Sequence, residues 1–352
     1  MKNSKFSKIL CVGMAGVMMT AAFTACNKSG DTTKETEETE QGETTEVTGD
    51  ETTIAAGASE CVIPEKFVFD GKFSVQVLGY EYFDTADAYD YDLLNVYYDF
   101  TPLSSELMGD NYIYWSCKQA GEDQEMNPAT NSKFGNCVFS DNIWISVQEG
   151  VTLRGMVSFS CKKGCTDELT IGVGENSNEY QYFSVDPKWE MPDIRHQAFE
   201  VAKVANPSFG PGNLAEATSP SGSYDIKING VTGVYTGSGL NCDGDVVDEK
   251  VIGISYTWTN HTGKDDDAFM IASLNNYVFQ DGVSLVVTGC PDDSEDAGKS
   301  QSELPEYQDI ADGESITYTV YYKLRSDSPV EVVFKDFFAT DCFADMVYDV
   351  PA

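Results

Sequence analysis

From Phe67 onward, the chain consists of short runs in which apolar and polar residues alternate, separated by clusters of Gly, Asn, Asp and Pro. The runs are rich in Val, Ile, Tyr, Phe and Thr, which favour extended strands, and no long segment has the periodicity of a helix. Many short strands joined by frequent turns form a sandwich or a barrel. We therefore predict an all-β fold for this part of the chain.

The strand pattern occurs twice, in the same order. FSVQVLGY at 73–80 aligns without a gap with YDIKINGV at 224–231. Further along, VQEGVTLRGMVSFSCKKGCTDELTI at 147–171 aligns without a gap with IADGESITYTVYYKLRSDSPVEVVF at 310–334. Few of the aligned residues are identical, so a chance likeness between two β patterns is the alternative explanation.

Turn residues support a true repeat, because Gly121 in an apparent turn of the first copy corresponds to Gly282 in the second. Since the order of the segments and the turn glycines agree, we predict two copies of one domain, at residues 65–195 and 219–352. Residues 196–218 between them are rich in Pro, Gly and Ser, as is typical of an exposed linker.

Three segments of the second copy resemble a known family. They read VIGISYTWTNHTGKD, NNYVFQDGVSL and DGESITYTVYYKLRSDSPVEV in chain order. They resemble the uncharacterised telokin-like, immunoglobulin-type domains of lipoproteins from Gram-positive bacteria, and the likeness covers residues 222–338. The first copy has the same outline but lacks the Ser-Pro at its hairpin. The resemblance implies two tandem immunoglobulin-like β-sandwiches in the cell envelope, and it supplies no catalytic residues.

The beginning of the chain has the composition of an export signal. Lys2, Lys5 and Lys8 precede an uncharged, mostly apolar run at 9–25. A positive segment followed by such a run is typical of a signal peptide that is later removed. We therefore predict a signal peptide at residues 1–25.

The signal ends in Phe23-Thr24-Ala25-Cys26, which resembles a bacterial lipobox with Phe23 in place of the usual Leu. The resemblance implies cleavage before Cys26 and attachment of a diacylglycerol to its sulfur. An uncleaved membrane helix is the alternative, because the apolar run is at the short limit of what spans a bilayer. Both alternatives place the remaining chain outside the cytoplasm. We predict a lipid-anchored protein on the extracellular face of the cell membrane.

Residues 26–64 are dominated by Thr and acidic residues and contain few apolar ones. Such a segment buries too little apolar surface to offset the entropy lost on ordering, so we predict a disordered tether. The whole chain has 22 Lys and Arg against 58 Asp and Glu, a net charge of −36. Because binding to a phosphate backbone depends on a basic surface, we predict no nucleic-acid partner.

Ten cysteines occur, and eight remain once Cys11 of the signal and Cys26 are set aside. An even number in an exported chain indicates disulfides, although the sequence does not show which residues pair. Cys161 and Cys165 form the candidate pair, because SCKKGCT falls where the repeat predicts a hairpin. Reduced thiols are an alternative; zinc is less well supported, because it needs two further ligands.

Catalytic motifs are not found. The two histidines, His196 and His261, lie in the predicted linker and at a strand end, and no G-x-S-x-G motif occurs. Gly172-Val173-Gly174 lacks the third glycine of a dinucleotide fingerprint. We predict no enzyme activity, no catalytic residues, no cofactor and no resident metal. The predicted role is non-catalytic binding of a protein, a glycan or an envelope component. A carboxylate-dependent cell-wall hydrolase and a sensor or accessory subunit of an envelope transporter are the alternatives.

Acidic clusters are candidate calcium ligands, because extracellular β domains bind calcium through several oxygen atoms. Solvated loops are the simpler explanation, so calcium is an open partner that we do not favour. The clusters are Asp84, Asp87, Asp90 and Asp92; Asp243, Asp245 and Asp248; Asp265, Asp266 and Asp267; and the segment from Asp292 to Glu303.

Aromatic residues on predicted strands are candidates for a contact patch for a sugar or a protein. Side chains alternate between the two faces of a strand, so about half of them should face the core. The candidates are Tyr112, Tyr114, Trp115, Trp144, Trp258, Tyr321 and Tyr322.

Overall fold

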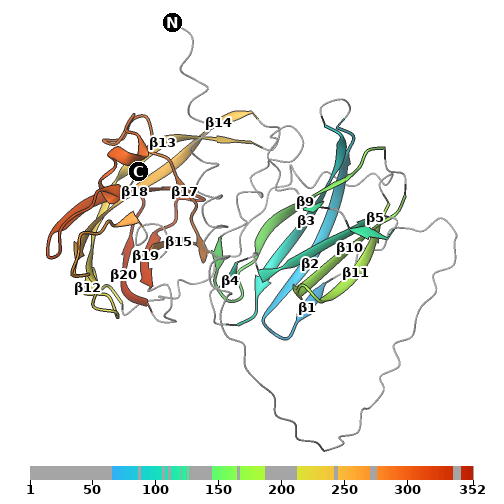
Figure 1. The fold of residues 1–352 in the computed structure, drawn as a ribbon, viewed down its shortest axis with the longest axis horizontal. Coiled ribbons are helices and arrows are strands. Elements are labelled where there is room, and N and C mark those ends of the chain that lie inside the picture. Colours follow the sequence, from blue (N-terminus) through green and yellow to red (C-terminus); the bar gives the residue numbers. More distant parts are fainter. Residues whose placement is uncertain are drawn as a thin grey trace, which may run out of the picture. The chain divides into compact units, whose positions relative to one another are not determined.

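The computed structural model describes twelve segments of the chain (Figure 1). They are residues 66–85, 89–104, 108–109, 112–119, 121–123, 125–126, 145–164, 167–186, 212–241, 245–269, 276–335 and 342–351. All of these segments belong to one compact unit, residues 61–352. The predicted signal peptide and the whole of the predicted tether, including Cys26, lie outside the described residues.

The first half of the compact unit contains two antiparallel sheets. One has the order β1 (Phe67–Phe69), β2 (Phe73–Phe83), β3 (Tyr91–Pro102), β9 (Leu153–Lys162) and β7 (Glu125–Met126). The other has the order β11 (Glu179–Val185), β10 (Leu169–Asn176), β5 (Tyr114–Gln119) and β6 (Glu122–Asp123).

The second half also contains two antiparallel sheets. One has the order β12 (Glu216–Thr218), β13 (Tyr224–Leu240), β14 (Val246–Asn260), β18 (Ser315–Lys323) and β17 (Val287–Thr288). The other has the order β20 (Cys342–Tyr348), β19 (Val330–Lys335), β15 (Asn276–Gln280) and β16 (Val283–Ser284), and continues through β8 (Ser146–Val147) and β4 (Met108–Gly109). Two short 3-10 helices, η4 (Gln301–Glu303) and η5 (Pro305–Tyr307), lie between β17 and β18.

The two halves have the same strand topology, which confirms the repeat. The order β1-β2-β3-β9-β7 in the first half matches β12-β13-β14-β18-β17 in the second, and β11-β10-β5-β6 matches β20-β19-β15-β16. The pairing of β2 with β3 shifts register before Gly79, and the pairing of β13 with β14 shifts before Gly230, the residue aligned with it. Gly121 and Gly282 both adopt positive φ, at 84° and 81°, as required in the tight turns they form. The described part of the chain is therefore β-structured apart from η4 and η5, with two tandem sandwiches.

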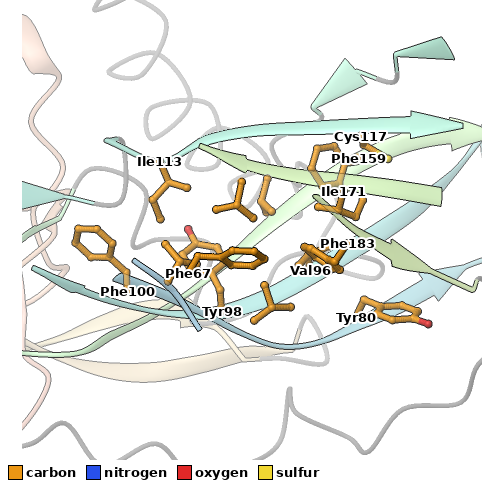
Figure 2. Close-up of a cluster of buried hydrophobic side chains, with 14 of the residues drawn as sticks. Phe67, Tyr80, Val96, Tyr98, Phe100, Ile113, Cys117, Phe159, Ile171 and Phe183 are labelled. Atoms are coloured by element: carbon orange, nitrogen blue, oxygen red, sulfur yellow. The ribbon is translucent and has the colours of Figure 1, made fainter. Parts of the chain in front are cut away.

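Each half has a hydrophobic cluster built from the inward residues of its two sheets. In the first, Phe100 of β3 and Phe159 of β9 are fully buried, together with Ile171 of β10 (Figure 2). Complete burial of a side chain of this size contributes about 1.5–3 kcal/mol. Alternation along the strands therefore accounts for the sandwich, because each strand contributes one apolar face.

Strand β8 belongs to the first half of the sequence but pairs with β16 of the second. Val147 lies opposite Val283, and the Gln148 N–H donates to the Gly282 carbonyl at 2.9 Å. Val283 is fully buried and belongs to the first cluster. Strand pairing therefore connects the two repeats in addition to the chain itself. The boundaries at 65–195 and 219–352 stay a prediction, and β12 occupies the end of the predicted linker.

Candidate binding surface

Three tyrosines gather on the outer face of the β11-β10-β5-β6 sheet. Tyr114 of β5 and Tyr182 of β11 are 45% and 49% exposed, and Tyr180 of β11 is half-buried beside them. On all three neighbouring strands the alternate residues, such as Cys117 and Ile171, face the first hydrophobic cluster. We call Tyr114, Tyr180 and Tyr182, with the glycines between them, the tyrosine surface.

Glycines in the central strand allow the tyrosine side chains to lie close to the sheet. Gly172 pairs with Tyr182, and Gly174 pairs with both Tyr180 and Tyr114. A Cβ atom on Gly172 would lie 2.8 Å from Cε1 of Tyr182, and one on Gly174 would lie 3.2 Å from Cδ1 of Tyr180. The rings of Tyr180 and Tyr182 therefore lie over backbone that has no side chains, with centroids 5.9 Å apart.

A lysine and a carboxylate border the tyrosine surface. The Lys118 ammonium lies 6.0 Å from the centroid of the Tyr182 ring and 3.7 Å from a carboxylate oxygen of Asp123. Burial raises the pKa of Tyr180, and the neighbouring Tyr182 and Asp123 raise it further. The Tyr180 hydroxyl therefore stays protonated at neutral pH and can both donate and accept hydrogen bonds.

An open groove of about 460 Å³ adjoins the tyrosine surface, between β1 and the β10–β11 hairpin. Tyr180 and Tyr182 form part of its wall, and Val68, 53% exposed, forms part of the other side. The remaining lining residues are mostly polar: Asp70, Glu175, Asn178, Glu179 and Gln181, with Phe69. The groove therefore offers polar and charged side chains to a ligand beside two tyrosine rings.

The aromatic candidates named from the sequence divide between surface and core. Tyr114 contributes to the tyrosine surface, and Tyr112 is equally exposed but lies near Tyr277 of β15. The other candidates contribute nothing to the surface: Trp258, Tyr321 and Tyr322 are buried, Trp115 packs against the first cluster, and Trp144 lies outside the described residues.

Sequence reasoning missed Tyr180 and Tyr182. The signal that identifies them is the Tyr-x-Tyr pattern at 180–182, which follows Gly-x-Gly at 172–174 across one hairpin. Alternation places the tyrosines and the glycines on the same face of adjacent strands. Gly172 and Gly174, which do not complete a dinucleotide-binding motif, thus have a structural role beneath the tyrosine rings.

Asp92, one of the calcium candidates, is fully buried and closes the hairpin after β9. Its carboxylate accepts hydrogen bonds from the Gly164 N–H at 2.7 Å, the Thr85 N–H at 3.0 Å and the Tyr82 hydroxyl at 2.9 Å. Burial raises its pKa, but these hydrogen bonds outweigh that effect and hold the pKa of Asp92 below its usual value. Asp92 therefore acts as a structural hydrogen-bond acceptor.

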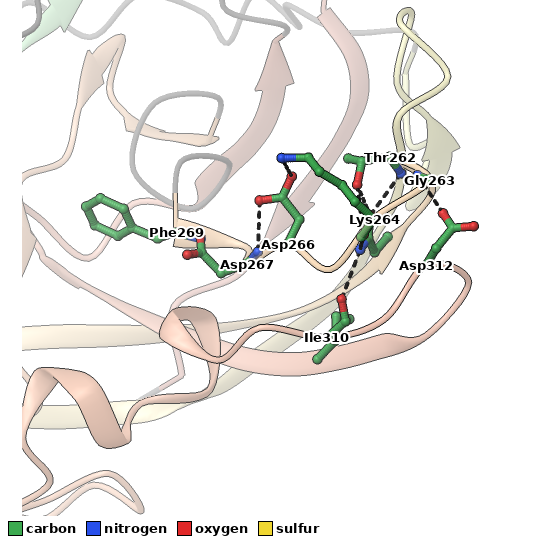
Figure 3. A network of polar contacts seen from close by, with 9 residues as sticks. Thr262, Gly263, Lys264, Asp266, Asp267, Phe269, Ile310 and Asp312 are labelled. Carbon is green, nitrogen blue, oxygen red and sulfur yellow. Dashed lines mark hydrogen bonds and ion pairs between the residues drawn. The ribbon is translucent and has the colours of Figure 1, made fainter.

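The cluster at 265–267 is also bound within its own loop (Figure 3). The Asp266 carboxylate accepts from the Asp267 N–H at 3.1 Å and lies 3.4 Å from the Lys264 ammonium. The backbone of Asp266 pairs with Ile310, and nearby Asp312 accepts from the Gly263 N–H at 2.9 Å. These contacts stabilise the loop between β14 and β15.

In the segment from Asp292 to Glu303, two carboxylates face protein donors. Asp296 accepts from the Tyr321 hydroxyl at 2.9 Å and from the Lys299 ammonium at 2.6 Å. Glu303 accepts from the Ser300 N–H at 2.7 Å and from the Ser300 hydroxyl at 2.6 Å. In the part of the chain that the structure describes, no three His, Cys, Asp or Glu side chains are placed to hold a metal ion.

Glu306 of η5 lies next to this segment and is only 9% exposed. Burial raises its pKa to about 7, and the charge of Asp296 acts in the same direction. Among the described residues, its Oε2 atom has no hydrogen-bond partner. Burial also raises the pKa of the Cys290 thiol to about 11, with a contribution from Asp296.

Of the cysteines predicted to carry the lipid or to form the disulfide, only Cys161 is among the described residues. Cys161 is buried at the end of β9, and its Sγ lies 3.9 Å from the Phe159 carbonyl oxygen. Cys165 and Cys26 lie outside the described residues, so the disulfide and the lipid attachment stay predictions. Among the residues that are described, no helix has the length and apolar character needed to cross a bilayer.

Comparisons with known proteins give one local match and two distant likenesses. A candidate lipoprotein from Staphylococcus aureus is 13% identical with a TM-score of 0.27, covering 39% of this chain and 93% of its own. MPT63, a secreted protein from Mycobacterium tuberculosis, is 15% identical with a TM-score of 0.26, covering 41% of this chain and 99% of its own. Both similarities are too low to support an assignment.

A search of curated proteins found no match. Residues 215–336 match a family described as "Domain of unknown function (DUF5067)". This agrees with the resemblance of residues 222–338 to an uncharacterised family, whereas the telokin-like assignment stays a prediction. The match covers less than half of the chain and lies within the second repeat, so it is the second sandwich that is similar to this uncharacterised family.

Proposed function

We propose that this protein is a lipid-anchored surface protein that binds a polymer of the cell envelope non-catalytically through the tyrosine surface. The observation that carries the proposal is the group of Tyr114, Tyr180 and Tyr182 on one open sheet face. Tyrosine is enriched at binding sites because its ring packs against a ligand while its hydroxyl forms hydrogen bonds. The lipid on Cys26 and the acidic tether would hold this face away from the membrane.

The binding test uses the full-length protein in a detergent without a sugar headgroup, because such a headgroup would compete for aromatic rings. Co-sedimentation with isolated Gram-positive cell walls should fall at least tenfold in the double variant Tyr114→Ala/Tyr182→Ala. Tyr112→Ala is the matched control, since Tyr112 is 48% exposed but lies beside Tyr277. Unchanged co-sedimentation of the double variant would overturn the proposal.

The anchor is tested separately in the host cell. Cys26→Ala removes the sulfur to which the lipid would be attached, so the protein should leave the membrane fraction. Retention of the variant in the membrane would favour the uncleaved helix instead.

One observation favours the alternative of a carboxylate-dependent hydrolase. The groove carries Asp70, Glu175 and Glu179, and glycosidases cleave sugars with a pair of carboxyl groups. The Lys72 ammonium, however, lies 3.6 Å from Glu175, and the Asn176 amide donates to Glu179 at 3.5 Å. The hydrolase is tested by measuring the release of reducing ends from cell walls. Loss of this activity in Glu179→Gln, with the activity kept in the exposed control Glu216→Gln, would establish it.

A further inference from the structure

The spacing of the tyrosines fits an extended chain of sugars. Tyr114 and Tyr180 both pair with Gly174, one on each side, so two strand spacings of about 4.8 Å separate their backbones. That separation is about the length of one disaccharide in an extended β-1,4-linked polysaccharide. Such a chain presents the same sugar face once per disaccharide. Two tyrosines whose backbones have this spacing can therefore meet equivalent sugar faces.

The glycines of β10 allow the rings of Tyr180 and Tyr182 to lie low against the sheet. Gly172 and Gly174 carry no side chain, and a Cβ atom at Gly172 would already lie 2.3 Å from the Ser116 hydroxyl oxygen. The Ser116 hydroxyl and the tyrosine rings therefore cover the glycines closely, so the rings lie low over the central strand and present a flat surface to a ligand that crosses the strands. An α-helix or a bulky protein side chain has a rounder contour than a ribbon of pyranose rings.

Charge narrows the class of sugar. The groove beside the tyrosine surface contains Asp70, Glu175 and Glu179, with Lys72 in contact with Glu175. The whole chain carries a net charge of −36. Polymers that carry uronic acids or phosphates are therefore repelled. The hydroxyl and amide groups of a neutral sugar can instead form hydrogen bonds with Asn178, Gln181 and the tyrosine hydroxyls.

We infer that the ligand of the tyrosine surface is an uncharged, extended β-linked polysaccharide, which crosses β5, β10 and β11 and continues into the groove beside β1. This inference rests on the proposed function and specifies its ligand. Tyr114 and Tyr180 bind sugar faces, and Tyr182 with the groove residues binds the adjoining unit.

The test is calorimetric titration of the full-length protein, in a detergent without a sugar headgroup, with soluble oligosaccharides. Chitohexaose or cellohexaose should bind, and the corresponding disaccharide should bind at least tenfold more weakly because it cannot reach both tyrosines. Hexagalacturonic acid, which has a similar length and carries carboxylates, should not bind. Maltohexaose, an uncharged chain that curves, should bind at least tenfold more weakly than the extended hexamers.

Variants then locate the site. Tyr180→Ala should weaken hexamer binding at least tenfold, whereas Tyr180→Phe keeps the ring and should stay within about threefold of the parent protein. Tyr112→Ala should have no effect. The urea midpoint of each variant identifies any loss that comes from unfolding instead of from the removed ring.

The outcomes separate this inference from the proposed function. If cell-wall binding depends on the tyrosines but neither uncharged hexamer binds, the ligand class is wrong and the binding surface stands. Equal binding of hexagalacturonic acid and chitohexaose also refutes the inference, because charge then has no role. If cell-wall binding is independent of the tyrosines, both fail.

Discussion

The two sandwiches share a topology but use corresponding faces in opposite ways. In the first, the outer face of β10 carries Thr170, Gly172 and Gly174, and the glycines lie beneath Tyr180 and Tyr182, of which Tyr182 is 49% exposed. In the second, the corresponding strand β19 carries Glu331 and Val333 on that face, and Val333 is fully buried. Asp345 of β20, on the same face, is also buried and accepts from the Gly212 N–H at 2.8 Å. The same strand topology therefore supports either an exposed or a covered outer sheet face, depending on which side chains that face carries.

The largest expected difference between the two faces comes from placing a charged residue at one aligned position in each sandwich. Val333 aligns with Thr170, which is only partly buried. Val333→Asp places an unpaired charge in a buried site and should lower the free energy of unfolding by about 4 kcal/mol. Thr170→Asp leaves the charge in contact with water, and its cost should stay below about 1 kcal/mol. Urea unfolding followed by tyrosine fluorescence measures both, and equal losses would show that the two faces are alike.

A side chain added beneath the tyrosines tests the open face directly. In Gly172→Val the new atoms meet the Ser116 hydroxyl and the Tyr182 ring, so the rings must move, at a cost of about 1–3 kcal/mol. Binding to cell walls should weaken at the same time. Gly289→Ala is the control, because a Cβ atom there has no neighbour within 4 Å, and it should change stability by less than about 0.5 kcal/mol. A neutral effect of Gly172→Val would mean that the tyrosines do not depend on the glycines.

Buried Glu306, which belongs to the second sandwich, should give that half a distinct response to pH. Its pKa is raised from 4.5 to about 7, so the folded state holds its proton more tightly than the unfolded state. Its contribution to stability is therefore complete below pH 4.5 and is lost as the pH rises through 7. Glu306→Gln removes the buried charge and should stabilise the protein at pH 8 by about 1–2 kcal/mol, with a smaller effect at pH 5.

Glu303 supplies the matched control for that experiment. The hydrogen bonds from the Ser300 hydroxyl and N–H lower its pKa, so its contribution is present above pH 4.5 and lost on acidification. Glu303→Gln should therefore destabilise the protein slightly at pH 8, the opposite sign to Glu306→Gln. The same sign in both variants would show that burial of Glu306 has no consequence for stability.

Much of the fold could be predicted from the sequence because strand alternation and turn glycines are local signals. The aligned residues Gly79 and Gly230 both follow an irregularity in the strand ladder, which the sequence did not predict. The candidate site was harder, because exposure depends on which strands lie beside one another. Trp258 and Tyr322 fit a strand as well as Tyr114 does, and only the sheet order shows that they face inward. Acidic residues such as Asp92 were ambiguous for the same reason, since their donors come from distant segments.

The long pairing of β13 with β14 affects how copies of this protein behave when they are packed close together. The two strands remain paired as far as Leu240 and Val246, whereas β18 accompanies β14 only between Val251 and Thr259. Among the described residues, no third strand pairs with either edge of the ribbon beyond that point, and Val246 is 75% exposed. Asp248 and Lys250 place charges beside these unpaired edges, and two glycines of β13 weaken them as templates for another strand. Densely packed copies of this protein are therefore expected to touch at these ribbons without forming an extended intermolecular sheet.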